Sequence, residues 1–288
     1  MPFFSVIIPV FNREDFIKKS IESVLNQSFE DYELIVIDDG STDNTSSVIK
    51  EFTPSLQYFY QKNKGVSSAR NHGIEKAQGK HICFLDSDDL WHKDKLLYHK
   101  NFIETNENID IHQTEDIWFR NNKRVNPHKK HLKPSGWIFP QSLDLCLISP
   151  SSVCIRKEIF MKHGAFDIKL PACEDYDLWL RLTSLYEIGL IKEPLLTRHG
   201  GHEDQLSSSF AVMDRFRVYS ILKLIMKNNI TQQYKDLSIK IVLKKLDIMK
   251  NGAVKRNRLE KIQLYENIIS SINNEDYTHI DFESLLSE

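Results

Sequence analysis

Short apolar segments alternate with helical segments in the first 90 residues, and this alternation restricts the fold more than any other feature of the sequence. The segments contain many bulky and β-branched residues, which is typical of strands buried on both faces of a parallel sheet. They are Phe4–Val10, Tyr32–Ile37, Leu56–Gln61 and Ile82–Leu85. A helix follows the first strand, where Asn12 is expected to act as its cap, and another is expected over 66–77. Strands joined by single helices predict an α/β protein with a doubly wound parallel sheet.

The fourth apolar segment breaks abruptly into an acidic cluster, Asp86-Ser87-Asp88-Asp89. Three carboxylates this close together repel one another unless a positive charge lies among them. A hard divalent cation with oxygen ligands, shared with substrate phosphates, meets this need. Ligands in open α/β sheets also bind outside the carboxyl ends of the strands. A helix N-cap is the simpler explanation, but one Asp suffices for a cap, so the pattern favours a metal site.

Two common phosphate-binding loops are absent from the sequence. Neither GxxxxGK[ST] nor GxGxxG follows the first strand, where Pro9-Val10-Phe11-Asn12 stands instead. A nucleotide bound at this sheet is therefore expected to be held by a metal at its diphosphate rather than by a glycine-rich loop.

Composition excludes several other classes of protein. A formal net charge of −2 and a pI of about 6.6 give no signature of nucleic-acid binding. The four cysteines show no CxxC spacing, which favours free thiols in a reducing compartment over disulfides or a zinc site. No apolar run approaches the roughly 18 residues of a membrane span, and the N-terminus lacks a basic leader. We therefore expect a soluble, cytoplasmic protein.

The second half of the chain is less regular. A strand is expected at Pro194–Arg198, and a helix is expected to begin at Glu174-Asp175, because Leu178, Trp179 and Leu182 follow at helical spacing. The acids in its first turn either interact with the helix dipole or supply a catalytic carboxylate, and the sequence leaves both readings open.

From residue 208 onward the pattern is helical and basic. Between Arg215 and Lys261 there are thirteen lysines and arginines but only three acidic residues. Basic helix faces are usually just solvated, and binding to an anionic membrane surface is the alternative. The expected organisation is a domain over 1–207, with a nucleotide-binding half (1–108) and an acceptor-binding half (109–207), followed by a helical region over 208–288.

Five motifs, in order along residues 4–207, resemble those of bacterial family 2 glycosyltransferases. They are Ser5-Val6-Ile7-Ile8-Pro9-Val10-Phe11-Asn12, Asp38-Asp39-Gly40-Ser41-Thr42-Asp43, Gly65-Val66-Ser67-Ser68-Ala69-Arg70-Asn71-His72-Gly73, Leu85-Asp86-Ser87-Asp88-Asp89 and Glu174-Asp175-Tyr176-Asp177-Leu178. The resemblance implies the GT-A fold, a Rossmann-like, mostly parallel central sheet flanked by helices, here with a C-terminal α-helical extension. It also implies an inverting, metal-dependent enzyme with a DxD motif.

The resemblance assigns donor-binding roles to residues at the strand ends. Pro9, Val10, Phe11 and Asn12 would line the nucleotide, largely through backbone contacts. Asp39, or Asp38 in its place, would accept a hydrogen bond from the uracil N3–H, although Asp39 before Gly40 is also an ordinary turn residue. Arg70 would lie near the base or the diphosphate.

The metal and the catalytic chemistry are assigned in the same way. Asp86 would face the ribose or the metal, and Asp88 would coordinate Mn²⁺ or Mg²⁺ at the diphosphate. Asp175 would be the catalytic base, and Glu174 would orient the acceptor. His202, in a His-x-x-Gln-x-Ser variant of a family pattern, is expected to reach the metal, with His199 as its competitor.

The function expected from this resemblance is transfer of a hexosyl or N-acetylhexosaminyl group from a UDP-sugar to the hydroxyl of a saccharide or a lipid-linked saccharide, in surface polysaccharide synthesis. The basic C-terminal helices would then contact the inner face of the membrane or form a dimer. The rivals are a catalytically silent nucleotide-sugar binding protein and, with less support, a sugar nucleotidyltransferase.

Overall fold

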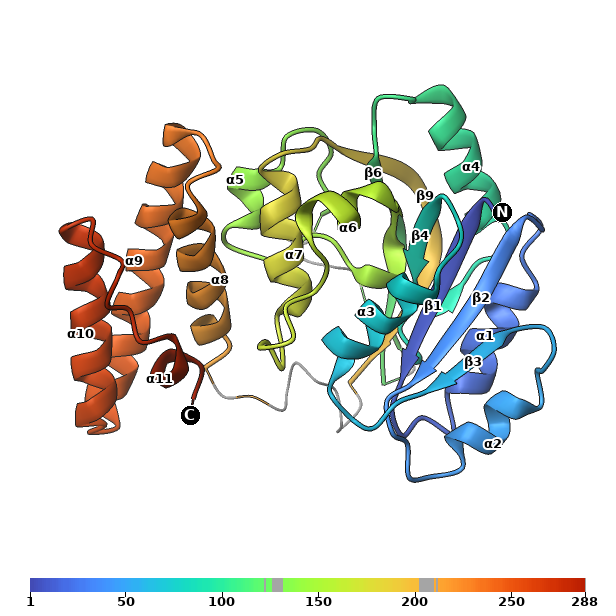
Figure 1. Cartoon of the computed structure of the whole chain (residues 1–288), viewed down its shortest axis with the longest axis horizontal. Coiled ribbons are helices and arrows are strands. Elements are labelled where there is room, and N and C mark those ends of the chain that lie inside the picture. The colour runs from blue at the N-terminus through green and yellow to red at the C-terminus, as the bar shows by residue number, and fades with distance from the viewer. Residues whose placement is uncertain (122, 126–131, 202–209, 211, 288) are drawn as a thin grey trace.

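The computed structural model describes the chain except residues 122, 126–131, 202–209, 211 and 288. Within the described residues a single mixed sheet runs through the larger part of the molecule, in the order β3-β2-β1-β4-β8-β6-β9-β5, with β7 paired to β6 (Figure 1). The strands are β1 (Phe4–Val10), β2 (Tyr32–Asp38), β3 (Gln57–Tyr60), β4 (His81–Phe84), β5 (Leu90–Trp91), β6 (Ile111–Arg120), β7 (Lys123–Val125), β8 (Val153–Arg156) and β9 (Ile188–Gly200).

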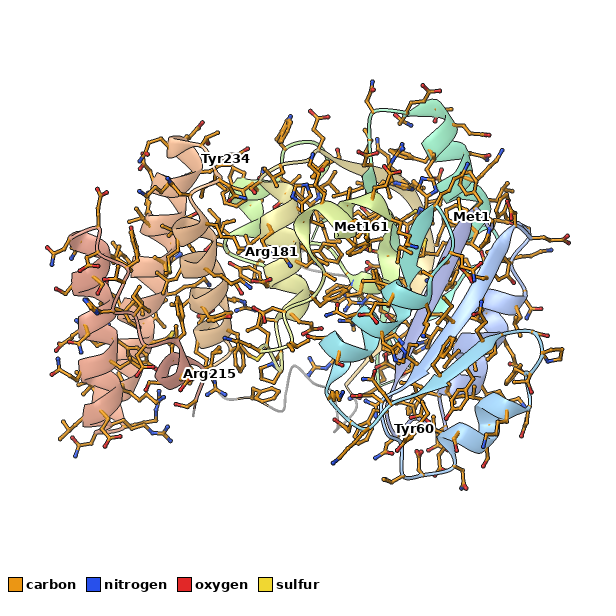
Figure 2. All side chains as sticks on the ribbon, in the orientation of Figure 1. Met1, Tyr60, Met161, Arg181, Arg215 and Tyr234 are labelled. Atoms are coloured by element: carbon orange, nitrogen blue, oxygen red, sulfur yellow. The ribbon has the colours of Figure 1, made fainter. Side chains whose placement is uncertain are left out.

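The first four strands form the parallel half that the sequence alternation predicts. β1 lies between β2 and β4, and β3 lies outside β2, all in parallel register. Val10 is paired with Asp38, and Asp38 with Tyr60, so β1, β2 and β3 end at the same edge. Figure 2 shows Tyr60 at the end of β3, where its side chain is 60% exposed. This edge carries the polar motifs.

The second half of the sheet is partly antiparallel. β8 runs antiparallel to both β4 and β6, whereas β6 and β9 are parallel to each other. The strand expected at Pro194–Arg198 is in fact the end of a 13-residue strand, β9, which follows β6 along its whole length through a bulge near Glu115. β5 pairs with β9 and thereby places the loop after β4 against Thr197.

Helices cover both faces of the sheet. Apolar residues of α1, α2 and α4 form one core layer, and those of α3, α6 and α7 form the other. The helices before residue 208 are α1 (Ile17–Leu25), α2 (Thr45–Lys50), α3 (Val66–Lys76), α4 (Lys95–Thr105), α5 (Phe139–Ser142), α6 (Glu158–His163) and α7 (Glu174–Thr183). A short 3₁₀ turn, Pro150–Ser152, precedes β8.

Asn12 does not cap the first helix, contrary to the sequence prediction. α1 begins at Ile17, and its N-cap residue is Phe16. Asn12 instead adopts a left-handed conformation with φ of 50°, and its side-chain oxygen accepts a hydrogen bond from the Thr42 amide at 2.8 Å. Asn tolerates this conformation because its short polar side chain can bond locally. Its role is to join the loops after β1 and β2.

The expected helical extension is present as α8 (Asp214–Lys227), α9 (Gln232–Lys255), α10 (Leu259–Asn273) and α11 (Phe282–Leu286). Among the described helices, none combines the length and the apolar character that crossing a membrane requires. These helices share a core with Tyr176 and Leu180 of α7. Tyr234 of α9, labelled in Figure 2, packs against the buried Phe139 of α5 with ring centroids 4.4 Å apart.

A partly buried ion-pair network also joins α8 to the sheet domain. Lys223 Nζ lies 2.5 Å from Asp177 Oδ1 on α7 and 2.6 Å from Asp167 Oδ2 in the preceding loop. Asp177 is 1% exposed, and its other oxygen accepts a hydrogen bond from Arg181 Nε at 3.0 Å. Lys223, one of the basic residues of the C-terminal region, therefore stabilises the contact between α8 and α7 rather than forming part of a solvated surface.

Candidate active site

The loop after β2 is organised around the carboxylate of Asp39. Asp39 Oδ1 accepts hydrogen bonds from the Lys64 amide at 2.9 Å and from Gln61 Nε2 at 2.7 Å, and Oδ2 accepts one from the Gly65 amide at 2.8 Å. The side chain is buried at 3% exposure. Asp39 thus fixes the turn that leads into α3, and the uracil contact expected of it would be an additional role.

Gly40 and Gly65 are required by the geometry of this turn. Gly40 has φ of 84°, and a Cβ there would come within 2.7 Å of the Asn63 amide nitrogen. Gly65, with φ of 87°, is the N-cap residue of α3 and presents its amide to Asp39. Only glycine adopts such conformations without strain, so the glycines of both motifs are explained by backbone shape.

Asp39→Asn should destabilise the protein by about 1–3 kcal/mol, because the amide offers one acceptor oxygen and its NH₂ would face a buried N–H donor. Urea unfolding measures this loss. Asp15→Asn, on an exposed residue, is the matched control and should change stability by no more than about 0.5 kcal/mol. Unchanged stability in Asp39→Asn would refute the scaffolding role.

Arg70 joins two of the acidic motifs. Its Nη1 donates to Glu174 Oε1 at 2.6 Å, and its Nη2 donates to Asp86 Oδ1 at 2.7 Å. The Arg70 side chain is 4% exposed, and its guanidinium also lies 5.1 Å from the centroid of the Phe166 ring. One cation thus binds two carboxylates that lie 16 and 104 positions away from it along the chain.

The helix that carries Arg70 is held tightly between β1 and the loop before α7. Gly73 lets α3 approach β1, since a Cβ at this position would lie 2.4 Å from Ile7 Cγ2. Asn71 exchanges two hydrogen bonds with the backbone of Phe166, each 2.9 Å long. These contacts fix the position of Arg70 opposite the start of α7.

The first turn of α7 presents two carboxylates in different environments. Glu174 is 5% exposed; burial raises its pKa to about 7, which Arg70 opposes and the Asp175 carboxylate reinforces. Asp175 is half-buried, and its Oδ2 accepts a hydrogen bond from the Cys146 thiol at 3.3 Å. Burial holds the pKa of the Cys146 thiol well above its usual value, so the thiol stays protonated and can donate. The residue before this turn, Cys173, has φ of 60°, a strained conformation of the kind found at functional sites.

The acidic cluster after β4 is held from several sides. The Asp86 amide donates to Ser151 Oγ at 3.0 Å, and Asp89 Oδ1 accepts from the His199 amide at 3.2 Å. Burial raises the pKa of Asp89 to about 8, and the Asp88 carboxylate adds to the rise while Arg198 opposes it. Near neutral pH the cluster therefore carries fewer than three negative charges.

The positive charge expected among these carboxylates is supplied in part by the protein itself. Arg70 is paired with Asp86, and Arg198 lies close enough to Asp89 to affect its pKa. Asp88 is half-buried between two buried neighbours, Ser87 and Asp89. The repulsion argument for a metal is thus weaker than the sequence suggested, whereas the oxygen donors that a hard cation needs are present.

Of the two histidines expected as metal ligands, the structure describes His199 but not His202. His199 lies at the end of β9, where its amide contacts Asp89 and its ring stacks on Phe119 with centroids 5.8 Å apart. His202 lies outside the described residues. The backbone of His199 therefore reaches the acidic cluster.

Three residues of the site carried no usable signal in the sequence. Cys146, Ser151 and Arg198 belong to no motif, and each reaches the site through a contact distant in sequence. The run Ser149-Pro150-Ser151-Ser152 after an apolar segment marks a turn, but nothing local indicates that it faces the acidic cluster.

Comparison with known proteins places more than half of the chain, including the first four of the five motifs, in one family. Residues 5–166 match the profile described as Glycosyl transferase family 2. An uncharacterized glycosyltransferase of Rickettsia bellii is 39% identical over 199 residues, which is 66% of this chain and 28% of the relative. A putative teichuronic acid biosynthesis glycosyltransferase of Bacillus subtilis, TuaG, is 41% identical over 99 residues, 33% of this chain and 39% of the relative. The chain spans about a third or less of the length of the first curated relatives it matches.

Solved structures share the fold. S. aureus TarS 1–349 in complex with UDP-GlcNAc superposes with a TM-score of 0.66 at 18% identity, covering 98% of this chain and 94% of that one. The mannosyltransferase PcManGT of Pyrobaculum calidifontis, in complex with GDP-Man and Mn²⁺, superposes with a TM-score of 0.60 at 15% identity, covering 99% and 85%. The GT-A fold expected from the motifs is thereby confirmed.

Proposed function

Because the chain belongs to glycosyl transferase family 2, we propose that it is an inverting glycosyltransferase that moves a sugar from a UDP-sugar to an acceptor hydroxyl. The observation that carries this proposal is the Arg70 bridge, in which Asp86 of the proposed donor site and Glu174 of the proposed acceptor site bind one guanidinium. Direct transfer requires the donor and the acceptor to meet, and the Arg70 bridge holds the two proposed binding sites next to each other.

The donor would bind along the edge where β1, β2 and β3 end. Phe11 is 42% exposed next to the buried Pro9 and Val10, so its ring is available to a base, and the backbone of the loop would face the nucleotide. Asp39 lies beside this loop, since its amide donates to the Val10 carbonyl at 2.8 Å. UDP is favoured because a carboxylate at this position can accept the uracil N3–H, and TarS was solved with UDP-GlcNAc.

The donor set fits a hard divalent cation. Asp88 is half-buried at the carboxyl end of β4, and the Asp86 side chain keeps 29% exposure while one of its oxygens binds Arg70. Carboxylate oxygens with room for water and phosphate suit Mn²⁺ or Mg²⁺. Such an ion would offset the charge that develops on the departing diphosphate. Asp88 and Asp86, with His202 in the proposed ligand set, would hold it.

The catalytic step that we assign to Asp175 is removal of the acceptor proton. Asp175 takes the hydroxyl proton as the acceptor oxygen attacks the anomeric carbon, and the bond from that carbon to the diphosphate breaks. Attack opposite the leaving group inverts the anomeric configuration. The Cys146 thiol and the Tyr176 amide, which donates at 2.7 Å, fix the Asp175 carboxylate, and Glu174 orients the acceptor.

The biological setting proposed is surface polysaccharide synthesis, which the similarity to TuaG supports. The acceptor would be a saccharide or a lipid-linked saccharide. A lipid-linked acceptor would place the protein at the cytoplasmic face of the membrane, where the exposed α9 lysines Lys240, Lys244 and Lys255 would contact anionic headgroups.

Asp88→Ala should weaken UDP binding at least tenfold in the presence of Mn²⁺ and leave the weak metal-free binding unchanged, because the mutation removes only the metal contact. Isothermal titration of UDP with and without Mn²⁺ measures this. Asp247→Ala, on an exposed residue of α9, is the control. Equal UDP affinity in the mutant and wild type at saturating Mn²⁺ would show that the acidic cluster is not the metal site.

A further inference from the structure

A second set of ligand-type side chains lies inside the protein, on the face of the sheet that α4 covers. Cys83 of β4 is paired with Cys154 of β8, and Cys154 is paired with His112 of β6. Directly paired residues on neighbouring strands point to the same face. His99 of α4 completes the group, and the ligand atoms of His99, His112 and Cys154 all lie within 4.8 Å of one another.

The two imidazole rings are left without hydrogen bonds. His99 is 0% and His112 is 1% exposed, and within the described part of the chain none of their four ring nitrogens has a hydrogen-bond partner. A buried imidazole retained for packing normally donates at least one N–H, because an unmet polar group inside a protein is destabilising. The rings are 4.8 Å apart, and that of His112 stacks on Phe102. Packing thus explains where the two rings lie, but not why polar imidazoles without hydrogen bonds occupy these positions.

The chemistry of the group suits a thiophilic metal ion. Burial lowers the pKa of both histidines, that of His112 to about 3, so both are neutral imidazoles and can act as ligands. Zn–N bonds of about 2.0 Å and Zn–S bonds of about 2.3 Å place tetrahedral ligand atoms about 3.5 Å apart. Side-chain shifts of about 1 Å would therefore bring the ligand atoms from the observed spacing to that of a zinc site. The Cys83 thiol hydrogen-bonds with the Cys154 thiol and is the fourth donor that we add to the group.

Lys95 lies one turn before His99 on α4, and its charge affects the pKa of His99, His112 and Cys154. Its Nζ donates to Thr114 Oγ1 at 2.8 Å, and burial lowers its pKa to about 7. Lys95 opposes the rise that burial causes in the pKa of Cys154, and so favours the thiolate that a metal binds. Two thiolates would neutralise a divalent ion, so a neutral site would lie beside a weakly charged amine. Lys133, Asp116 and His81 are the other titratable groups whose charge reaches this region.

We propose that His99, His112, Cys154 and Cys83 form a buried structural site for Zn²⁺, distinct from the carboxylate site proposed for Mn²⁺ or Mg²⁺. The ion would tie α4 to β4, β6 and β8, and β4 is the strand that ends at the acidic cluster. Cysteine spacing could not reveal this site because its ligands come from four separate elements. The proposal does not depend on the proposed function.

The test is the metal content of the full chain, produced without a polyhistidine tag in zinc-supplemented medium. We expect about one zinc per chain by mass spectrometry after gel filtration. Protein produced with Co²⁺ instead should show the sulfur-to-metal charge-transfer band and the intense d–d bands of a tetrahedral thiolate site. Cys154→Ser and His99→Gln should lose these bands. Asp88→Ala should keep them, because carboxylates give no such charge-transfer band.

His163→Gln is the matched control, since His163 Nε2 bonds to the Tyr186 hydroxyl 2.8 Å away, outside the cluster. This variant should keep its metal, and the melting temperature of the wild type should fall when the ion is removed. Folded wild-type protein that contains no zinc and gives no thiolate–cobalt band would overturn the proposal. So would retention of the bands in Cys154→Ser. The wild-type measurement decides the matter even where a cluster variant fails to fold.

Discussion

Asp175→Asn should lower the rate of sugar transfer by about 10²–10⁴-fold, because the amide cannot take the proton of the acceptor hydroxyl. UDP binding should be unchanged, since the Asp175 side chain is bonded by Cys146 and the Tyr176 amide and has no assigned contact with the donor. UDP release from a UDP-sugar, with water as the acceptor, provides the assay before the natural acceptor is known.

The control for this substitution is Glu187→Gln, on an exposed residue after α7. It should retain wild-type turnover. Wild-type protein that binds UDP but never releases it from any UDP-sugar would support the silent binding protein instead. An active Asp175→Asn enzyme would require a different base, and Glu174 would be the next to test.

Arg70→Met should destabilise the protein by about 3–5 kcal/mol, because it leaves the buried Glu174 and the partly buried Asp86 without their common cation. Activity should also be lost, since both proposed substrate sites lose their connection. Arg70→Lys should be intermediate, because one ammonium cannot reproduce a guanidinium that binds two carboxylates through separate nitrogens. Chemical unfolding and UDP release measure the two effects.

Two further variants make this prediction specific. Arg156→Met removes an ion pair with Asp110 in which the side chains are 41% and 29% exposed, and should cost no more than about 1 kcal/mol. Adding Glu174→Gln to Arg70→Met should restore part of the lost stability, because a neutral amide tolerates burial better than an unpaired carboxylate. If Arg70→Met were no more harmful than Arg156→Met, the bridge would not organise the site.

The parallel half of the fold could be predicted because its information is local. Each strand lies in a largely apolar segment, and the helices after β1 and β3 were expected from the sequence as well. The order of β8, β6 and β9 could not be predicted, since antiparallel and parallel pairings there join segments tens of residues apart. β9 was underestimated because Lys192-Glu193 interrupts its apolar pattern, although the strand continues through the bulge beside β6.

The predictions for the site divide in the same way, into local features that the sequence indicates and long-range contacts that it does not. The strand-end motifs marked where the polar groups lie, but not what they contact. Asp39 was expected to meet a base, and its carboxylate proves to be bonded to the turn before α3. A metal ion was expected beside the acidic cluster, and the side chains of Arg70 and Arg198 also reach the cluster from distant segments, which the sequence did not indicate. Sequence patterns identify residue types at strand ends, but long-range partners are set by packing.

The Lys223 ion pairs and the shared apolar core bind the C-terminal helices to the sheet domain. Deleting them would leave Asp177 and Asp167 without the ammonium they share and would uncover the apolar side of α7 at Tyr176 and Leu180. A change in the C-terminal helices would in turn affect α7. α7 begins with Glu174 and Asp175, so a ligand or a surface that shifts α8 would move the helix that carries the proposed base. One helix-to-helix contact, between α8 and α7, therefore links the helical extension to the proposed active site.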